Sequence, residues 1–113
     1  MKKIKIILFT VFGLSLVSCI TMTNAADMDN GKTVFNKWCL PCHGDGPGYP
    51  GTAALAAKYN GEIPAVLQSR KDMTEDFVKL FVRQGVSIMP FFRKTEITDS
   101  ELNNLAAYLS SKK

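Results

Sequence analysis

The stretch WCLPCH at residues 38–43 holds the side chains best suited to chemistry, two thiols followed directly by an imidazole. A Cys-x-x-Cys pair can act as a redox dithiol, contribute to a zinc site or, when histidine follows, attach a haem covalently. Trp38 and Pro41 add a similarity to the thioredoxin type of dithiol. The three chemistries need different surroundings, so the neighbouring elements must decide between them.

The surroundings of Cys39 and Cys42 favour haem attachment. A thioredoxin-type dithiol lies where a strand leads into a helix, whereas here a helical pattern precedes Cys39 and a glycine-rich loop follows His43. A structural zinc site needs four ligands, and the chain after residue 25 offers only these three thiol and imidazole groups. Thiols that bond the two vinyl groups of one porphyrin must lie a short turn apart, and the next histidine then lies under the iron. The pattern therefore predicts a covalent haem at Cys39 and Cys42, with His43 as an iron ligand.

Amphipathic helices are expected at both ends of the domain. The first covers residues 30–38, and its apolar residues share one helical face: Gly31, Val34, Phe35 and Trp38. The last begins at Thr98, where Glu101 completes a capping box. Its apolar residues repeat the same spacing: Leu102, Leu105, Ala106 and Leu109. These two helices are expected to bracket the fold.

The middle of the chain predicts shorter helices and loops. Residues 44–51 must form a loop, and a short helix from Thr52 to Ala57 should end at Asn60-Gly61. Another short helix can open at Pro64. A stronger helix runs from its cap at Thr74 to Gly85, and a loop at residues 86–97 follows, where Val86 to Ile88 is the only candidate strand. The predicted fold class is all-α, with loops that enclose the haem.

The N-terminus has the features of an export signal. Three lysines precede an apolar run at residues 6–17, which is too short to span a bilayer comfortably and is typical of a secretory signal. Small residues before Ala26 predict a signal peptide over residues 1–25. Alternatively, Leu-Val-Ser-Cys ends a lipoprotein signal at residues 1–18 and leaves a lipidated Cys19. Both alternatives predict a periplasmic protein, which is held at the membrane only if Cys19 is lipidated.

The charge of the domain at residues 26–113 is nearly balanced. The whole chain carries 14 basic and 10 acidic side chains, but three of the bases are the lysines before the apolar run. Nucleic-acid binding usually requires a dense basic face, so no nucleic-acid partner is expected. A domain this small buries a limited core, and a large covalent cofactor would relieve that shortage.

The chain resembles the class I cytochromes c of the short bacterial kind. The resemblance covers nearly the whole of residues 26–113, from NGKTVFNKWCLPCHGDGPG through VRQGVSIMPFF to DSELNNLAAYL. It implies a small cytochrome c fold with one covalent haem c, in which the N- and C-terminal helices cross. The crossing would place Gly31 and Phe35 against Leu105 and either Tyr108 or Leu109.

The resemblance also implies the second axial ligand. With His43 as the only histidine, two histidine ligands are excluded, and methionine is the remaining soft ligand. Gly85 and Met89-Pro90 match the family pattern G-x-x-x-M-P, which implies that His43 and Met89 bind the metal. A proline carbonyl in the following loop would accept the other imidazole N–H; Pro50 is favoured, with Pro47 as the alternative.

Several further residues are candidates for contact with the haem or with a partner. Trp38 and one of Phe91 and Phe92 could cover the haem, and Tyr59 and Arg70 could reach a propionate. Three basic residues near the ligand loop could form a docking patch, or simply a solvated face: Arg83, Arg93 and Lys94.

An iron with two axial protein ligands has no open position for a substrate, so we expect electron transfer and no catalysis. The segment at residues 50–97 resembles the small cytochrome subunits of p-cresol methylhydroxylase and eugenol hydroxylase flavocytochromes. That resemblance implies a flavoprotein dehydrogenase as partner. The alternative is a freely diffusing periplasmic carrier that delivers electrons to a terminal oxidase. A third possibility, displacement of Met89 and peroxide chemistry at the iron, is disfavoured.

Overall fold

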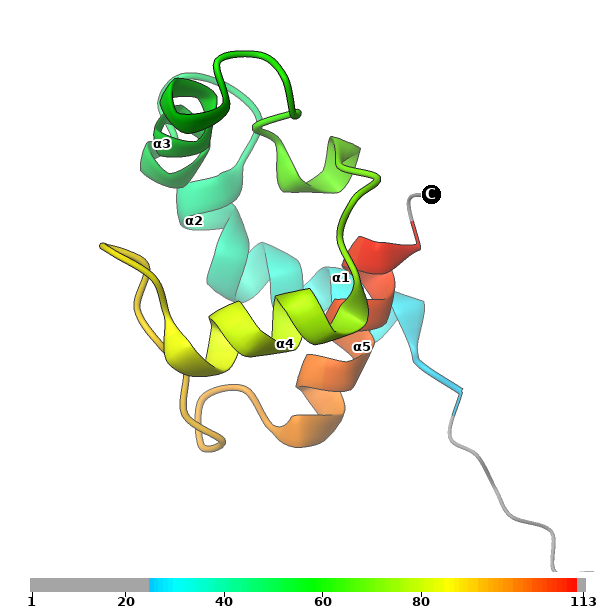
Figure 1. Cartoon of the computed structure of the whole chain (residues 1–113). Helices are drawn as coiled ribbons and strands as arrows, with labels where there is room; N and C mark the ends of the chain where they lie inside the picture. Colours follow the sequence, from blue (N-terminus) through cyan, green and yellow to red (C-terminus); the bar gives the residue numbers. More distant parts are fainter. Residues whose placement is uncertain (1–24, 112–113) are drawn as a thin grey trace, which may run out of the picture.

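The computed structural model describes residues 25–111, and this part of the chain is helical, as predicted. Apart from an isolated bridge between Val86 and Met89, these residues form no β-structure, so the candidate strand at 86–88 is not formed. Figure 1 shows α4 and α5 side by side, with α2 and α3 across from α4. The predicted signal peptide, including Cys19, lies almost entirely outside the described residues.

The chain is helical without interruption from Met28 to His43. Helix α1 (Met28–Val34) is capped by Asp27, whose carboxylate accepts a 2.9 Å hydrogen bond from the Asn30 N–H. A π-helical turn, η1 (Phe35–Cys39), continues directly into α2 (Leu40–His43). The helix is therefore longer than the predicted 30–38, and π-helical turns occur frequently at functional sites. As a result, the whole Cys-x-x-Cys-His motif is held on helical backbone.

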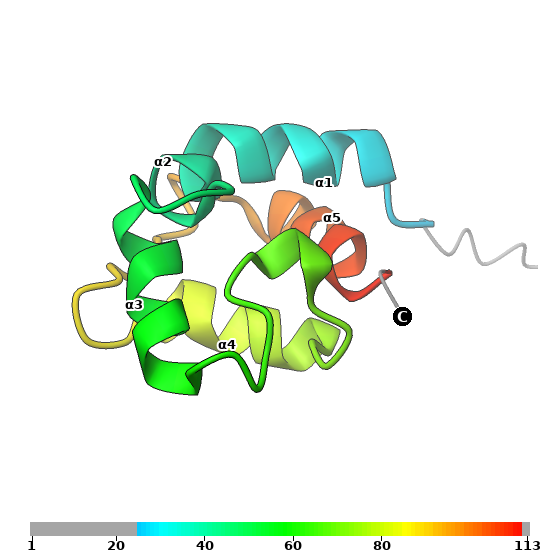
Figure 2. The ribbon, with the colours of Figure 1, turned by 90° about the horizontal axis from the view of Figure 1, so that it is seen from above.

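The predicted crossing of the terminal helices is formed. Figure 2 shows α1 lying across α5 (Asp99–Ser110). A Cβ atom at Gly31 would collide with the Asn104 carbonyl and would lie 2.8 Å from Cβ of Tyr108, so only glycine permits this close approach. The rings of Phe35 and Tyr108 pack with centroids 6.1 Å apart. Phe35 and Leu105 are both fully buried at the centre of the core.

Helix α3 (Pro50–Tyr59) begins earlier than predicted. Thr52 is not its cap: the residue is buried, and its hydroxyl donates a 2.7 Å hydrogen bond to the Gly44 carbonyl. Asn60 ends the helix in the left-handed region, as expected. The helix predicted at Pro64 is reduced to a single 3₁₀ turn, η2 (Leu67–Ser69).

Helix α4 (Glu75–Gln84) and helix α5 have the predicted ends. The Thr74 hydroxyl accepts a hydrogen bond from the Phe77 N–H, and Gly85 ends α4 with φ of 67°. Thr98 and Glu101 form the complete capping box at the start of α5. Within residues 25–111, none of the helices combines the length and the apolar character that crossing a membrane requires.

Candidate functional site

A cavity of about 500 Å³ lies between η1, α2, α3, α4 and the loop that follows α4. Its walls are mostly apolar, and Leu105 and Leu109 of α5 close its inner side. Four side chains predicted from the sequence as haem ligands or attachment points all line it: Cys39, Cys42, His43 and Met89. The fold thus gathers residues from two distant stretches of the chain around one space.

The two thiols line this cavity from consecutive helical turns, Cys39 at the end of η1 and Cys42 in α2. Both are free thiols; Cys39 is partly buried and Cys42 is exposed. Burial, together with the neighbouring Cys42, raises the pKa of the Cys39 thiol to about 12. Redox-active dithiols instead have a lowered thiol pKa, because the thiolate is the nucleophile. The environment of this pair therefore suits covalent attachment better than disulfide exchange.

The imidazole of His43 packs against α3. A Cβ atom at Gly51 would lie 2.7 Å from Cε1 and 2.9 Å from Nδ1 of His43, so the glycine makes room for this edge of the ring. Burial lowers the pKa of His43, which favours the neutral imidazole that binds metals. Because the Nδ1 edge faces Gly51, Nε2 is the nitrogen available to a metal in the cavity.

Pro50 lines the cavity but does not orient His43 as predicted. Nδ1 of His43 is buried and has no hydrogen-bond partner in the described part of the chain. Pro50 is the first residue of α3. A carbonyl at that position points along the helix towards its C-terminus, which explains why it does not accept the imidazole N–H. Close packing on Gly51, a residue that no sequence motif marked as functional, orients the ring instead.

The loop at residues 85–92 presents Met89 in a tight turn. Val86 and Met89 exchange two backbone hydrogen bonds of 3.1 and 2.9 Å, and Ser87 between them has φ of 53°. The loop also folds back on Gly85, where a Cβ atom would lie 2.6 Å from the Met89 carbonyl oxygen. The backbone of Met89 is thus fixed by its own turn and by contact with the end of α4.

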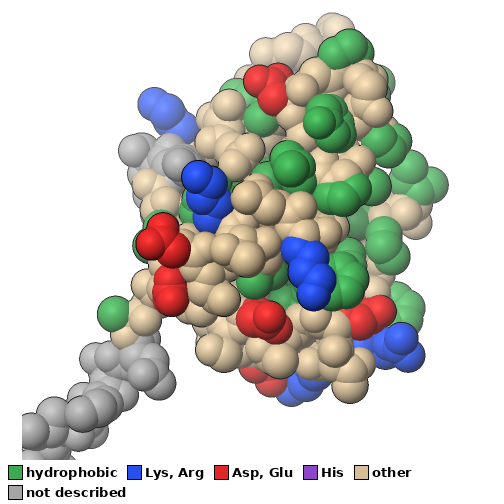
Figure 3. Space-filling view, turned by 180° about the vertical axis from the view of Figure 1, so that it is seen from behind, with side chains coloured by type: hydrophobic (Ala, Val, Ile, Leu, Met, Phe, Trp, Pro, Cys, Tyr) green, Lys and Arg blue, Asp and Glu red, His purple; other side chains and the backbone are tan. Residues whose placement is uncertain are grey.

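Aromatic residues divide between the cavity and the surface. Trp38 and Phe92 both line the cavity and pack edge to face, with centroids 5.8 Å apart. Phe91 points away and is 61% exposed, and Ile88 is 80% exposed. Seen from behind in Figure 3, hydrophobic side chains gather along the edge on which the loop after α4 projects. Phe92, rather than Phe91, therefore covers the cavity.

Arg70 is the buried cation of the site. It is 4% exposed, lines the cavity and donates to Asp72, with Nε 2.9 Å from Oδ1. Hydrogen bonding to Asp72 raises the pKa of Arg70 further, so the side chain stays charged. Its guanidinium carbon lies 5.2 Å from the centroid of the Tyr59 ring. A cation held beside an apolar cavity suits a ligand that carries carboxylates.

The basic residues around the ligand loop are largely neutralised by acids. Arg83 and Lys94 both pair with Asp99, at 2.8 and 2.7 Å, and Arg93 lies 3.5 Å from Glu96. Three cations thus face two carboxylates, which leaves little net charge. The patch considered from the sequence is a network of ion pairs rather than a strongly positive surface.

Comparisons with known proteins agree with this geometry. A protein-family model described as "Cytochrome C oxidase, cbb3-type, subunit III" matches residues 26–109. Cytochrome c6 of Pyropia yezoensis is 32% identical over 98% of this chain and 94% of its own length. Cytochrome c6 of Porphyra purpurea is 29% identical over the same shares, and that of Thermosynechococcus vestitus is 32% identical over 83% and 78%.

The chain belongs to the class I c-type cytochromes. Cytochromes of this family carry a single covalent haem c and transfer electrons, so the protein is an electron carrier and not a catalytic enzyme. The residues present fit that group. The cavity is mostly apolar, and an imidazole, a thioether, two thiols and a buried arginine line it.

Proposed function

We propose that the protein is a one-electron carrier whose haem occupies the 500 Å³ cavity, joined to Cys39 and Cys42 by thioether bonds. His43 and Met89 would bind its iron. One observation carries the proposal: a single apolar cavity brings these four side chains together from two separate stretches of the chain. Bound there, the haem supplies a one-electron iron couple, and methionine sulfur raises its reduction potential.

The protein's own residues would hold the group and keep water away. The helical turn of α2 presents His43 as a neutral imidazole, with its Nδ1 edge against Gly51. Arg70 offers a fixed positive charge to the carboxylates of the haem, and Trp38 and Phe92 cover part of the cavity wall. With His43 and Met89 as its two protein ligands, the iron would have no position left for a substrate.

Electrons would enter and leave beside the ligand loop. Ile88 and Phe91 are the most exposed large apolar side chains of the described residues and flank Met89 in sequence. The surrounding cations are paired with Asp99 and Glu96, so little charge is available to steer a partner over long distances. This surface favours short contacts with an apolar partner face over strong electrostatic attraction.

A freely diffusing carrier is the partner arrangement that we favour. The cytochrome c6 relatives align with nearly all of this chain and of their own lengths, and the family description names subunit III of a cytochrome c oxidase. The oxidase named in the family description supports electron transfer to a terminal oxidase. The protein would be exported to the periplasm by the signal at residues 1–25, or anchored there by a lipid on Cys19. The mass of the mature N-terminus distinguishes these two products.

A cytochrome subunit of a flavoprotein dehydrogenase is the second candidate. The apolar side chains of Ile88 and Phe91 favour it, because a permanent partner would cover exposed apolar surface. Purification from the native host tests both arrangements. A flavoprotein that co-elutes at fixed stoichiometry supports the subunit, whereas a single red protein of monomer size supports the diffusing carrier.

The axial ligand is tested by substituting the two methionines that line the cavity. Met89→Ala should remove the weak sulfur-to-iron band near the red end of the oxidised spectrum and lower the reduction potential. Met73→Leu is the matched control, because Met73 also lines the cavity but is 3% exposed within the core. A band that survives Met89→Ala would disprove the ligand assignment.

A further inference from the structure

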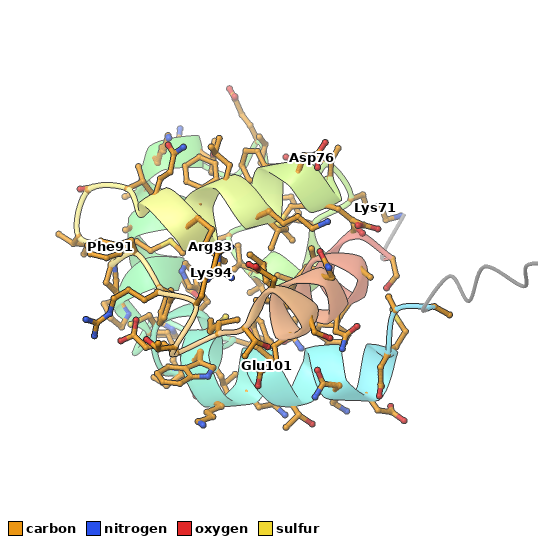
Figure 4. The ribbon with its side chains drawn as sticks, turned by 90° about the horizontal axis from the view of Figure 1, so that it is seen from below. Lys71, Asp76, Arg83, Phe91, Lys94 and Glu101 are labelled. Atoms are coloured by element: carbon orange, nitrogen blue, oxygen red, sulfur yellow. The ribbon has the colours of Figure 1, made fainter. Side chains whose placement is uncertain are left out.

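We propose that Arg83 is a positioning residue that holds the Met89 loop closed through one guanidinium fork. The inference rests on the proposed role of Met89 as an axial ligand. Within residues 25–111, Arg83 neither lines the cavity nor bonds to Met89; it acts on the backbone at the end of the loop. Figure 4 shows Arg83 and Lys94 beside one another next to α4, with Phe91 on the projecting loop.

The two arms of the fork bind two different elements. Nη1 of Arg83 donates a 2.9 Å hydrogen bond to the carbonyl of Phe92, and Nη2 donates a 2.8 Å hydrogen bond to Oδ1 of Asp99. Phe92 closes the ligand loop, and Asp99 is the first residue of α5. The side chain is 22% exposed, so these bonds are partly sheltered from water. One side chain of α4 therefore joins the loop and α5.

The backbone of Phe92 is fixed to α4 at both of its polar groups. Its N–H donates a 2.8 Å hydrogen bond to the Val82 carbonyl, and its carbonyl accepts from Arg83. At the other end of the loop, Gly85 is in contact with the Met89 carbonyl. Met89 lies between these two anchors. Loss of the Arg83 bond would weaken the downstream anchor, because the Phe92 carbonyl would lose its partner from α4 and only the bond from the Phe92 N–H to Val82 would remain.

Arginine suits this position because its planar guanidinium offers several donors in fixed directions. Lys94 carries the same charge and pairs with the same carboxylate, at 2.7 Å from Oδ2 of Asp99. Its side chain is 74% exposed, and its ammonium contacts Asp99 rather than the backbone of the ligand loop. Substituting Lys94 therefore removes a positive charge beside Asp99 but leaves the bond to the Phe92 carbonyl intact, so it is the matched control for substituting Arg83.

The experiment measures how easily the loop opens in the oxidised holoprotein. Imidazole can bind the iron only when the Met89 sulfur has left, so its apparent affinity rises with the fraction of open loop. Arg83→Met should raise the apparent imidazole affinity about tenfold, since a charge-assisted hydrogen bond is lost. The apparent imidazole affinity of Arg83→Lys should lie between those of Arg83→Met and the parent. Lys94→Met should stay within about twofold of the parent, because exposed ion pairs contribute little.

The outcomes separate this inference from the proposed function. An affinity for Arg83→Met within about twofold of the parent overturns the role of Arg83, as does an equal rise in Lys94→Met. In either case the proposed ligand still stands if Met89→Ala binds imidazole much more tightly than the parent. If Met89→Ala leaves the imidazole affinity unchanged, the ligand assignment itself fails, and the inference about Arg83 fails with it. Circular dichroism and the Soret band confirm that each variant is folded and loaded.

Discussion

The crossing of α1 with α5 and the cavity beside α2 use similar apolar side chains but complete their packing differently. At the crossing, every partner is protein: Gly31 meets the Asn104 carbonyl, and the buried Phe35 ring meets Tyr108. Around the cavity, the walls face a space of about 500 Å³ that no side chain of the described residues fills. Leu105 and Leu109 belong to both regions. The crossing is therefore a scaffold that the chain builds alone, whereas we expect the cavity to depend on the haem.

The largest test of this difference is removal of the haem through Cys39→Ala combined with Cys42→Ala. Without the haem, the mostly apolar walls of the cavity would lose their packing partner, and a typical domain has only about 5–15 kcal/mol of stability to lose. We expect the apoprotein to lose its cooperative thermal transition and its near-UV circular dichroism. Part of the far-UV helical signal should remain, because the caps of α4 and α5 are local.

The contrast between the two regions fails if the apoprotein unfolds cooperatively with a near-UV spectrum like that of other folded domains. In that case the walls of the cavity would have collapsed onto one another, and the protein would not need the haem to complete its core. A variant that retains haem through one thioether should have a thermal stability between those of the holoprotein and the apoprotein.

The same division explains which parts of the fold were predictable from sequence. Helix ends held by local bonds were predicted correctly, as at Thr74, Gly85 and the Thr98–Glu101 capping box. The start of α3 was not, because Thr52 bonds the Gly44 carbonyl, and that contact is set by tertiary structure. Helix caps formed by neighbouring residues can be predicted from one sequence, whereas contacts between distant segments cannot.

The second test acts on the crossing alone. Gly31→Val should destabilise the holoprotein by about 2–4 kcal/mol, because a side chain there collides with the Asn104 carbonyl and α1 must move away from α5. Thermal melts of the loaded protein measure this loss. The red-end absorption band should persist in the folded protein, since the ligand loop is attached to α4 rather than to α1.

Gly48→Ala is the control for the glycine substitution. A Cβ atom at Gly48 meets no other atom within 4 Å, so the stability should stay within about 1 kcal/mol of the parent. If Gly31→Val removed the red-end band before unfolding, the crossing and the ligand loop would be coupled, and the two regions could not be treated as independent.

The candidate site was predictable to the same extent as the fold. The Cys-x-x-Cys-His spacing and the resemblance to cytochromes c placed Cys39, Cys42, His43 and Met89, and all four line one cavity. The contact of Gly51 with the imidazole and the bond from Arg83 to the Phe92 carbonyl had no signal in the sequence. Both are contacts between segments that only the folded chain brings together, so spacing along the chain could not reveal them.

The smallest expected effect concerns the capping box that starts α5. It measures how much one local cap contributes to the stability of the scaffold. Hydrogen bonds from the Thr98 N–H and hydroxyl, both 2.8 Å, lower the pKa of Glu101. A carboxylate with a lowered pKa stabilises the fold above the ordinary glutamate value of about 4.3, and this stabilisation is lost as the pH falls through the lower folded value. Glu101→Gln should therefore destabilise the protein by about 0.5–1 kcal/mol at pH 7, and the difference in Tm between this variant and the parent should shrink below about pH 4.

Glu62→Gln is the control, because it removes the same charge from the turn after α3. A Tm difference between Glu101→Gln and the parent that stays constant down to pH 2 would show that the carboxylate charge contributes nothing to the cap.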